Sequence, residues 1–393
     1  MLDTLMPQPA DALLALIKSH AADPRPGKID LGVGVYRTDS GATPVFAAVK
    51  AAERLLLEQQ DSKSYLGPEG DLAFVEALKP HVFGAALGDP ARLGGLQTPG
   101  GTGGVRLAVA LAARAGVKCI HLGLPSWPNH AQIIEDVGIE CAGFNHACED
   151  GSADVEAVLS LIRAAGEGEA VLLHGCCHNP TGVDYTAADW DRIAAALADG
   201  RVLPIIDIAY QGLGEGMAAD VAGARAVLAA VPEALVAYSC DKNFGLYRDR
   251  VGAFYVLARD PGQLPAILSN ANAFARATWS MPPDHGAAAV RLILSDERLT
   301  RQWQEELTGM RTRICEVREQ LAAADQRAPG LGLKALTRQH GLFAMLALGK
   351  GQIDRLRDEH AIYMAASGRI NVAGLHRGNI EAFVAALEAV GQG

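Results

Sequence analysis

The chain has 393 residues, of which 49% are hydrophobic and 20% charged, so it can bury a large core and is neither disordered nor fibrous. Its net charge of −10 argues against a nucleic-acid partner, because proteins that bind the phosphate backbone usually present a basic face. The seven cysteines are odd in number and scattered, without a CxxC pair, so we expect reduced thiols in a protein of the cytoplasm.

The N-terminus and the apolar runs give no sign of targeting or membrane insertion. Residues 1–20 carry an acid, Asp3, where a signal peptide would be positively charged, and their apolar run is short and amphipathic. No stretch approaches the roughly 18 to 20 apolar residues that a membrane-spanning helix needs. We therefore expect a cytoplasmic protein whose partner is a small molecule.

A glycine-rich loop opens a predicted helix in residues 97–116. Unpaired amides and the positive end of the helix dipole converge there, where an anion such as a phosphate could bind. The pattern is not a dinucleotide fingerprint, because Arg106 replaces the third glycine, and no GK[ST] follows as in a P-loop. By itself the loop leaves phosphate binding and an ordinary glycine turn equally open.

Short apolar runs alternate with Ala-rich segments of helical spacing in the middle of the chain. This alternation predicts right-handed crossovers and a mostly parallel sheet covered on both faces, which is an α/β fold. The expected strands are 118–125, 171–176, 203–210, 234–240 and 252–258, and the clearest helices are 187–200 and 220–231.

The pattern changes after about residue 300. A long charged amphipathic helix is expected over 296–324, followed by a compact set of helices and strands around 342–348 and 361–374. We expect a large domain of residues 41–300 and a small domain formed by residues 1–40 together with residues 301–393.

Polar side chains follow three of the expected strands. Asn179 follows the 171–176 strand, Asp207 lies near the end of the next one, and Lys242 follows the 234–240 strand. Their separations of 28 and 35 residues are each about one βαβ unit, so all three should emerge at the carboxyl edge of the sheet. That edge is where open α/β sheets bind ligands.

Together with the glycine-rich loop and Arg250, these residues meet the requirements of pyridoxal 5′-phosphate. A lysine forms the Schiff base with the aldehyde of this cofactor, a carboxylate pairs with its ring nitrogen, and an anion cradle holds its phosphate. We assign Lys242 and Asp207 to the first two tasks. Arg250 suits the third, because a guanidinium grips phosphate with two hydrogen bonds.

Longer motifs carry a family resemblance. They are SWPNH (126–130), HGCCHNPTG (174–182), DIAYQG (207–212), KNFGLYRDRVGA (242–253) and SGRINVAG (367–374). Over nearly its whole length the chain resembles the class I pyridoxal-phosphate aminotransferases of the aspartate and aromatic amino acid subgroup. The resemblance implies the aspartate aminotransferase-like fold of type I and a homodimer with shared active sites. It also implies ping-pong amino transfer between an L-amino acid and 2-oxoglutarate.

The resemblance implies a role for each matching residue. Lys242 would carry the Schiff base and move the proton between Cα and C4′, while Asp207 would pair with the ring nitrogen. Tyr210 and Asn179 would hydrogen-bond the phenolate oxygen of the ring, and Trp127 would stack on it. The phosphate would be held by Gly101, Thr102, Ser239 and Arg250, with Tyr65 reaching over from the other subunit.

Two arginines match substrate positions of the family. Arg369 corresponds to the arginine that binds the α-carboxylate, and Arg276 to the one that reaches across the dimer to a side-chain carboxylate. This pair predicts a dicarboxylic amino acid such as aspartate, although the apolar Trp279 and Met281 are compatible with aromatic substrates. The other substrate contacts that the resemblance implies are Gly34 and Phe343 at lid positions, Trp127 and Asn179.

One residue departs from the family pattern beside the lysine. Asp241 stands where the family has a small hydroxyl residue. A carboxylate there would repel the phosphate, so it must point away or be neutralised by a neighbour.

Competing interpretations are weaker. His174, Cys176 and His178 would share one face if their strand continued, with Cys177 opposite, but no second ligand pair supports a metal and we expect none. The lack of a GxSxG elbow argues against a serine hydrolase. A β-lyase or decarboxylase with the same cofactor remains as an alternative, against which the two substrate arginines argue. A non-catalytic sensor with this fold would need a basic DNA-binding segment, which we do not find.

Overall fold

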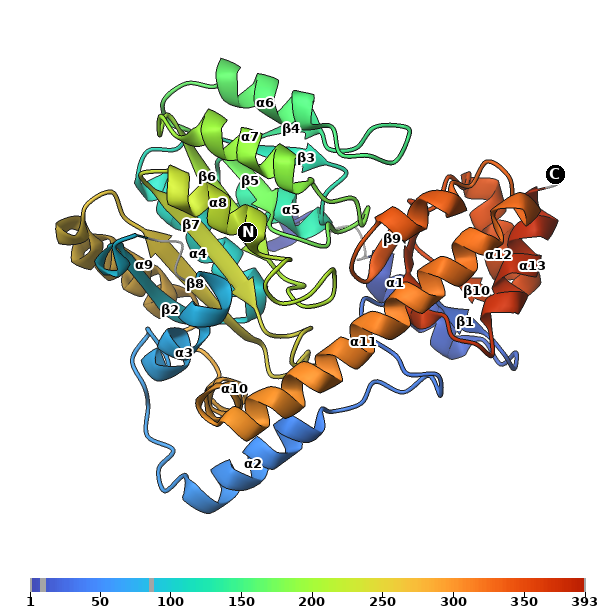
Figure 1. Ribbon diagram of the computed structural model, residues 1–393, viewed down its shortest axis with the longest axis horizontal. Coiled ribbons are helices and arrows are strands. Elements are labelled where there is room, and N and C mark those ends of the chain that lie inside the picture. Colours follow the sequence, from blue (N-terminus) through green and yellow to red (C-terminus); the bar gives the residue numbers. More distant parts are fainter. Residues whose placement is uncertain (1, 8–11, 85–87, 392–393) are drawn as a thin grey trace. The chain divides into compact units, whose positions relative to one another are not determined.

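The structure is a computed structural model that describes residues 2–7, 12–84 and 88–391 (Figure 1). The chain divides into two compact units. The larger unit comprises Pro44–Arg313 and Arg338–Gly341, and the smaller unit Met1–Thr43, Ile314–Thr337 and Leu342–Gly393. Among the described residues, no helix combines the length and the apolarity needed to cross a membrane.

A seven-stranded sheet in the order β2-β8-β7-β6-β5-β3-β4 forms the centre of the larger unit. All neighbouring strands are parallel except β8, which runs antiparallel to both β2 and β7. The α/β class with a mostly parallel sheet is therefore confirmed. The strands are β2 (Leu93–Pro99), β3 (Cys119–Leu124), β4 (Glu140–Asn145), β5 (Glu169–His174), β6 (Val202–Ile208), β7 (Ala234–Ser239) and β8 (Val251–Leu257).

Helices cover both faces of this sheet, as the alternation in the sequence predicts (Figure 1). The predicted helix 187–200 is α7, whose first turn is fixed by a reciprocal capping box between Thr186 and Asp189. The helices of the larger unit are α2 (Ala47–Gln59), α3 (Leu72–Val82), α4 (Gly100–Arg114), α5 (Pro128–Val137), α6 (Val155–Ala164), α7 (Ala187–Leu197), α8 (Ala222–Ala230), α9 (Leu264–Thr278) and α10 (His285–Ser295).

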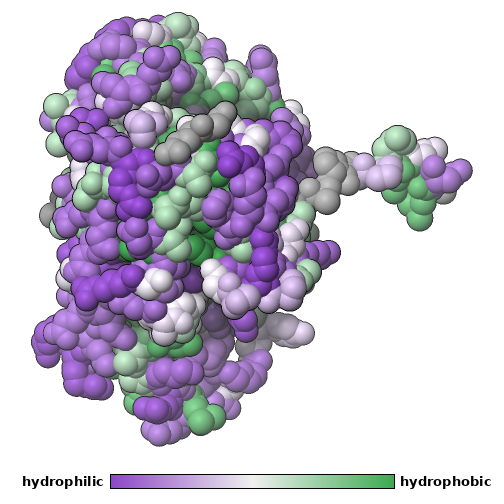
Figure 2. Space-filling model, turned by 90° about the vertical axis from the view of Figure 1, so that its right-hand side faces the viewer, coloured by the Kyte–Doolittle hydropathy of each residue, from purple (hydrophilic) through white to green (hydrophobic). Residues whose placement is uncertain are grey.

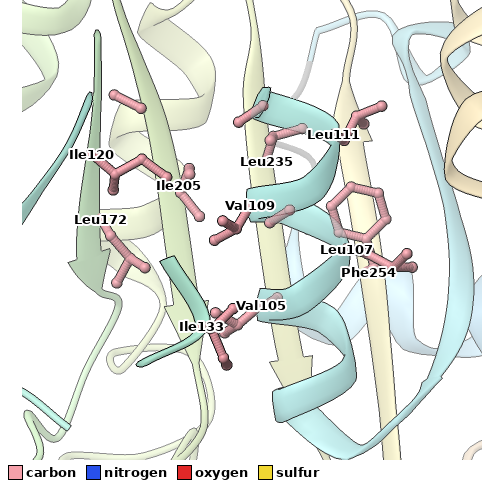
Figure 3. Packing of buried hydrophobic residues seen from close by; sticks show 14 of the residues in the cluster. Val105, Leu107, Val109, Leu111, Ile120, Ile133, Leu172, Ile205, Leu235 and Phe254 are labelled. Atoms are coloured by element: carbon pink, nitrogen blue, oxygen red, sulfur yellow. The ribbon is translucent and has the colours of Figure 1, made fainter. Parts of the chain in front are cut away.

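The core of the larger unit lies between α4 and the sheet (Figure 3). Val105 and Leu107 of α4 are fully buried and pack toward the strands that carry Ile205 and Phe254. Gly104 allows the close approach, because a Cβ there would lie 3.0 Å from the Cβ of Ala237 and 3.1 Å from a backbone oxygen of β8. This packing fixes the amino end of α4 against the ends of β7 and β8, next to residue 242.

The smaller unit joins the two ends of the chain. Strand β1 (Ile29–Asp30) pairs in parallel with β10 (Ile362–Tyr363), and β9 (Phe343–Met345) pairs antiparallel with β11 (Arg369–Asn371). The predicted long helix 296–324 is α11 (Glu297–Ala323), a single helix that runs from the larger unit into the smaller one. The other helices of the unit are α1 (Ala12–Ala22), α12 (Lys350–His360) and α13 (Ile380–Gly391).

One face of the protein is mostly hydrophilic (Figure 2). Hydrophilic residues cover most of the face in Figure 2, with small hydrophobic areas between them. Single exposed apolar side chains are normal on protein surfaces.

Candidate active site

Three adjacent parallel strands, β5, β6 and β7, end at one edge of the sheet. Asp207 is the second-last residue of β6, and Lys242 follows the end of β7 by three residues. The Nζ of Lys242 lies 5.3 Å from the ring centroid of Tyr210, which comes from the loop after β6. The structure therefore places Lys242 near Asp207 and Tyr210 at the carboxyl edge, where the spacing of Asp207 and Lys242 predicts them.

Burial lowers the pKa of Lys242 below its ordinary value. Asp241 and Asp207 act in the opposite direction, since negative charges favour the ammonium form, but burial outweighs them. A larger fraction of neutral amine is what a lysine needs in order to act as a nucleophile or a base near pH 7.

The two oxygens of Asp207 have different surroundings. Oδ2 lies 3.0 Å from Nε2 of His130, a fully buried residue of α5. Oδ1 is buried and has no hydrogen-bond partner among the described residues. A buried carboxylate oxygen without a donor is costly, so it marks the place where a cationic N–H belongs. A protonated pyridine nitrogen fits this requirement.

A single backbone amide sets the tautomers of the histidines behind Asp207. The N–H of Asn179 donates to Nδ1 of His174 at 3.2 Å, so neutral His174 carries its proton on Nε2. Nδ1 of His130 accepts either from that Nε2, at 3.2 Å, or from the hydroxyl of Ser126, at 3.1 Å, and His130 then donates from Nε2 to Asp207. The direction of donation therefore ends on the carboxylate of Asp207.

The row of imidazoles continues beyond His174. His178 stacks on it at 4.1 Å, and His146 stacks on His178 at 3.6 Å. Burial lowers the pKa of each of these three side chains, and the neighbouring imidazoles lower those of His174 and His178 further. All three are therefore neutral near pH 7, which the tautomer assignment requires.

Sequence reasoning did not assign a role to His130 or His146. His130 belongs to the quoted SWPNH motif, and its position in the first turn of a helix that follows a strand was the available signal. His146 has no such signal, because only the tertiary structure places it on His178.

The condition under which His174, Cys176 and His178 would share one face, that their strand continues, is not met. Strand β5 ends at His174, so the alternation of side chains stops there. Cys176 lies instead with Cys177 and Asp220, whose ligand atoms are within 4.8 Å of one another.

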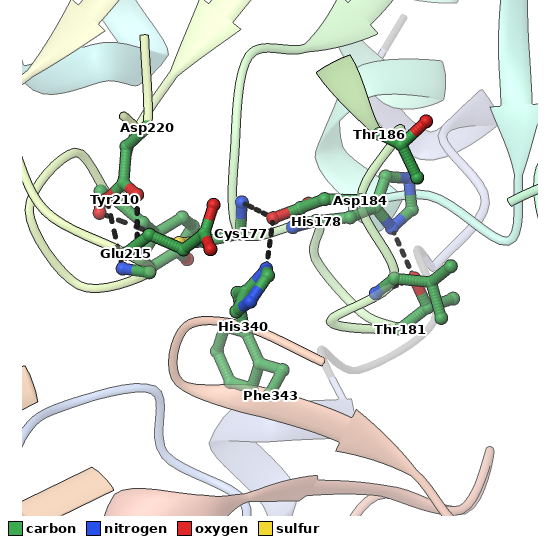
Figure 4. A network of polar contacts seen from close by, with 12 residues as sticks. Cys177, His178, Thr181, Asp184, Thr186, Tyr210, Glu215, Asp220, His340 and Phe343 are labelled. Carbon is green, nitrogen blue, oxygen red and sulfur yellow. Dashed lines mark hydrogen bonds and ion pairs between the residues drawn. The ribbon is translucent and has the colours of Figure 1, made fainter. Parts of the chain in front are cut away.

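Two carboxylates fix the loops that carry Asn179 and Tyr210. Asp184 accepts hydrogen bonds from the backbone N–H groups of Cys177 and His178 at 2.8 and 2.9 Å and pairs with His340 (Figure 4). Asp220 accepts four backbone N–H groups of residues 212–216. Both loops are thereby held without regular secondary structure.

An anion cradle lies at the amino end of α4. The N-cap, Pro99, offers no side-chain cap, which leaves the first N–H groups of the helix for another acceptor. Gly101 approaches Ser239 so closely that a Cβ would lie 2.9 Å from the Ser239 Cβ. A Cβ on Gly100 would lie 2.5 Å from Nη2 of Arg250. The cradle therefore joins the predicted residues Gly101, Ser239 and Arg250, with Thr102 in the first turn of the same helix.

Asp241 is neutralised by a neighbour, which was one of the two expected outcomes. Its Oδ2 forms an ion pair with Nη1 of Arg250, and its Oδ1 accepts the backbone N–H of Val251 at 2.9 Å. The side chain is 1% exposed, against 40% for Arg250. Burial raises the pKa of Asp241, while Lys242 and Arg250 act to lower it.

Three further predicted residues of the larger unit are Trp127, Arg276 and Tyr65. Trp127 contacts the imidazole of His130 edge-on, with centroids 5.0 Å apart. Arg276, in the last turn of α9, is exposed and hydrogen-bonds Ser280, and Tyr65 is 94% exposed.

Arg369, Phe343 and Gly34 come together within the smaller unit. The guanidinium of Arg369 lies 4.5 Å from the Phe343 ring centroid, and its Nη2 donates to the carbonyl of Gly32 at 3.0 Å. A Cβ on Gly34 would lie 2.5 Å from the Phe343 ring.

A lysine with a lowered pKa just after a strand end, an anion cradle at a helix terminus and a half-partnered buried carboxylate define a pyridoxal-phosphate enzyme. The model of the family "Aminotransferase class I and II" matches residues 26–387. The chain belongs to this family, and its cofactor is pyridoxal 5′-phosphate.

Individual relatives agree with this assignment. The chain is 50% identical to a tyrosine aminotransferase of Rhizobium meliloti, over 95% of this chain and 96% of the relative. It is 40% identical to the aspartate aminotransferase of Escherichia coli, over 99% of this chain and the whole of the relative. An aromatic-amino-acid aminotransferase from Burkholderia pseudomallei, solved covalently bound to pyridoxal phosphate, is 32% identical with a TM-score of 0.94 and covers 99% of both chains.

Proposed function

We propose that this protein transfers the amino group between an L-amino acid, either aspartate or an aromatic amino acid, and 2-oxoglutarate. The observation that carries the proposal is the buried, unpartnered Oδ1 of Asp207 beside an oxygen that His130 already occupies. Such an oxygen suits a ring nitrogen that must stay protonated. An alternative β-lyase or decarboxylase is not favoured, because the relatives above are aminotransferases.

Pyridoxal phosphate supplies an electron sink that stabilises the carbanion formed at Cα of the amino acid. Lys242 would hold the cofactor covalently and, once released by the substrate, its Nζ would take the proton from Cα and return it to C4′. The lowered pKa of this amine suits it to both directions of proton transfer. The carboxylate of Asp207 would keep the ring nitrogen protonated throughout the reaction.

Other residues would bind and orient the reactants. The α4 terminus, Thr102 and Ser239 would bind the phosphate, and Tyr210 and Asn179 would hydrogen-bond the phenolate oxygen of the ring. Trp127, already in contact with His130, would cover one face of the cofactor ring. In this arrangement the larger domain of residues 41–300 binds the cofactor.

The substrate carboxylates would be bound by two arginines. Arg369 would take the α-carboxylate, with its guanidinium oriented by the Phe343 ring and Gly32. Arg276 would take the distal carboxylate of a dicarboxylic substrate. We further propose a cytoplasmic homodimer in which Arg276 and Tyr65, both exposed in the single chain, serve the site of the other subunit.

A panel of amino donors tests the function. Purified protein loaded with pyridoxal phosphate is assayed with 2-oxoglutarate and aspartate, tyrosine or phenylalanine, and glutamate and the 2-oxo acid product are quantified. We expect equal amounts of the two products and a kcat/KM for the best donor in the range of about 10⁴ to 10⁸ M⁻¹s⁻¹ that is common for enzymes. Release of ammonia or carbon dioxide in place of glutamate would show a lyase or decarboxylase, and Lys242→Ala serves as the inactive control.

A further inference from the structure

Asp241 lies inside the anion cradle and not merely beside the lysine. A Cβ on Gly100 would lie 2.7 Å from Oδ2 of Asp241 and 2.5 Å from Nη2 of Arg250, so the ion pair rests against the first turn of α4. The carboxylate thus lies beside the amino end of a helix, where an anion is stabilised. The protein already supplies one negative charge to the place where a phosphate would bind.

Arg250 uses one of its three guanidinium nitrogens, Nη1, for this ion pair. Nη1 bonds both Oδ2 of Asp241 and the carbonyl oxygen of Tyr247, the latter at 3.2 Å. Nη2 and Nε make no hydrogen bond to the described residues, which leaves their N–H groups for a phosphate. The charge of the guanidinium is nevertheless balanced by a carboxylate that is 1% exposed, and water screens such a buried charge poorly.

We propose that Asp241 weakens the hold of the cradle on the phosphate group, so that this protein binds pyridoxal phosphate reversibly and exchanges it with the solution. This inference rests on the proposed function, since it concerns the same cofactor. The backbone bond from Val251 to Oδ1 keeps the carboxylate in place, so it is not free to swing away when a phosphate arrives. Phosphate and carboxylate must then share one guanidinium and one helix terminus.

The test compares two ligands that differ only in the phosphate. The dissociation constants of pyridoxal and pyridoxal 5′-phosphate are measured by absorbance titration of the cofactor-free protein, for the wild type, Asp241→Asn and Asp241→Ser. Asp241 also affects the amine of Lys242, but that effect is common to both ligands and cancels in the ratio of the two constants. The ratio therefore isolates the interaction between residue 241 and the phosphate.

We expect the preference for the phosphorylated ligand to rise at least about tenfold in both variants, with a slower loss of cofactor on dialysis. Asp241→Asn keeps the acceptor for Val251 and the side-chain shape, so it gives the answer even if Asp241→Ser folds poorly. Asp191→Asn, which removes an exposed acid on α7, is the control for net charge and should leave the ratio unchanged.

An unchanged or smaller ratio in Asp241→Asn would overturn the inference. A smaller ratio would mean that Asp241 orients Arg250 toward the phosphate and so strengthens binding. If the wild type bound neither ligand, the proposed function itself would fail, and this outcome is distinct from both of the others.

Discussion

Oδ2 of Asp207 lies 3.0 Å from Nε2 of His130, while Oδ1 of the same carboxylate has no partner among the described residues. The first contact fixes the rotation of the carboxylate, and the second oxygen is left for a ligand. Because His174 accepts the N–H of Asn179, the donation runs from His174 through His130 toward Asp207. The site is thus organised to receive a cation before the cofactor binds.

The first prediction concerns this carboxylate. Asp207→Asn removes the charge that keeps the ring nitrogen protonated, so kcat should fall by about a hundredfold to a thousandfold, as when a preorganised electrostatic group is lost. His130→Gln removes only the residue that positions Asp207, and a loss of about tenfold to a hundredfold is expected. Kinetics with the best donor measure both effects. Equal losses in the two variants would contradict the separate roles.

The second prediction concerns the buried amine. Since the pKa of Lys242 is lowered in the folded protein, the unfolded chain holds the proton up to higher pH. Burying the amine therefore costs stability below the folded pKa, and this cost disappears as pH rises toward the ordinary value of 10.5. Cofactor-free Lys242→Met should be more stable than the wild type at pH 7, with a difference that shrinks at higher pH.

Urea unfolding of the cofactor-free proteins between pH 7 and pH 10 measures this difference. Exposed Lys350→Met is the control and should show no such trend. A difference that grew with pH would show that the carboxylates around Lys242 outweigh its burial.

The third prediction concerns the stacked histidines. Their pKa values are lowered in the folded state, so below the ordinary value of 6.5 the unfolded chain takes up protons that the folded protein does not. Each histidine should then reduce the free energy of unfolding by up to about 1.4 kcal/mol per pH unit as pH falls. The protein should be stable above pH 6.5 and lose stability steeply in mild acid.

His146→Gln isolates one of these contributions, because glutamine can still donate to the Val183 carbonyl that His146 Nε2 bonds at 2.9 Å. Denaturant unfolding at several pH values from 5 to 8 should show a smaller slope in this variant. An unchanged slope would mean that His146 is protonated in the folded protein.

The fourth prediction concerns the substrate arginines. Arg276→Ala should reduce kcat/KM for aspartate by roughly 30-fold to 1000-fold, which corresponds to a loss of about 2 to 4 kcal/mol in transition-state binding. The kcat/KM for phenylalanine should change little, because only aspartate has a distal carboxylate. Arg369→Ala should reduce kcat/KM for both substrates by similar factors. Equal losses for the two substrates in Arg276→Ala would show that its assigned role is wrong.

The positions of the candidate site residues were predictable where they follow from the regular alternation of strands and helices. Asn179, Asp207 and Lys242 recur at intervals of one βαβ unit, and parallel strands necessarily end at the same edge. Strands β2 and β4 were not predicted, because β2 contains two glycines and ends in a proline, and β4 is partly exposed and lacks a run of branched side chains.

The sequence by itself determined the α/β class and the cofactor chemistry, because these depend on residue types at regular intervals along the chain, and its long motifs carried the resemblance to the family. Only the tertiary structure decided which oxygen of Asp207 is left for a ligand, the direction of donation through His174 and His130, and the pairing of Asp241 with Arg250. His130 and Asp207 are 77 positions apart, and a loop with φ of 56° at Arg250 turns its guanidinium back on Asp241. Contacts of this kind depend on the packing of distant segments and on burial, and no local pattern in the chain encodes them.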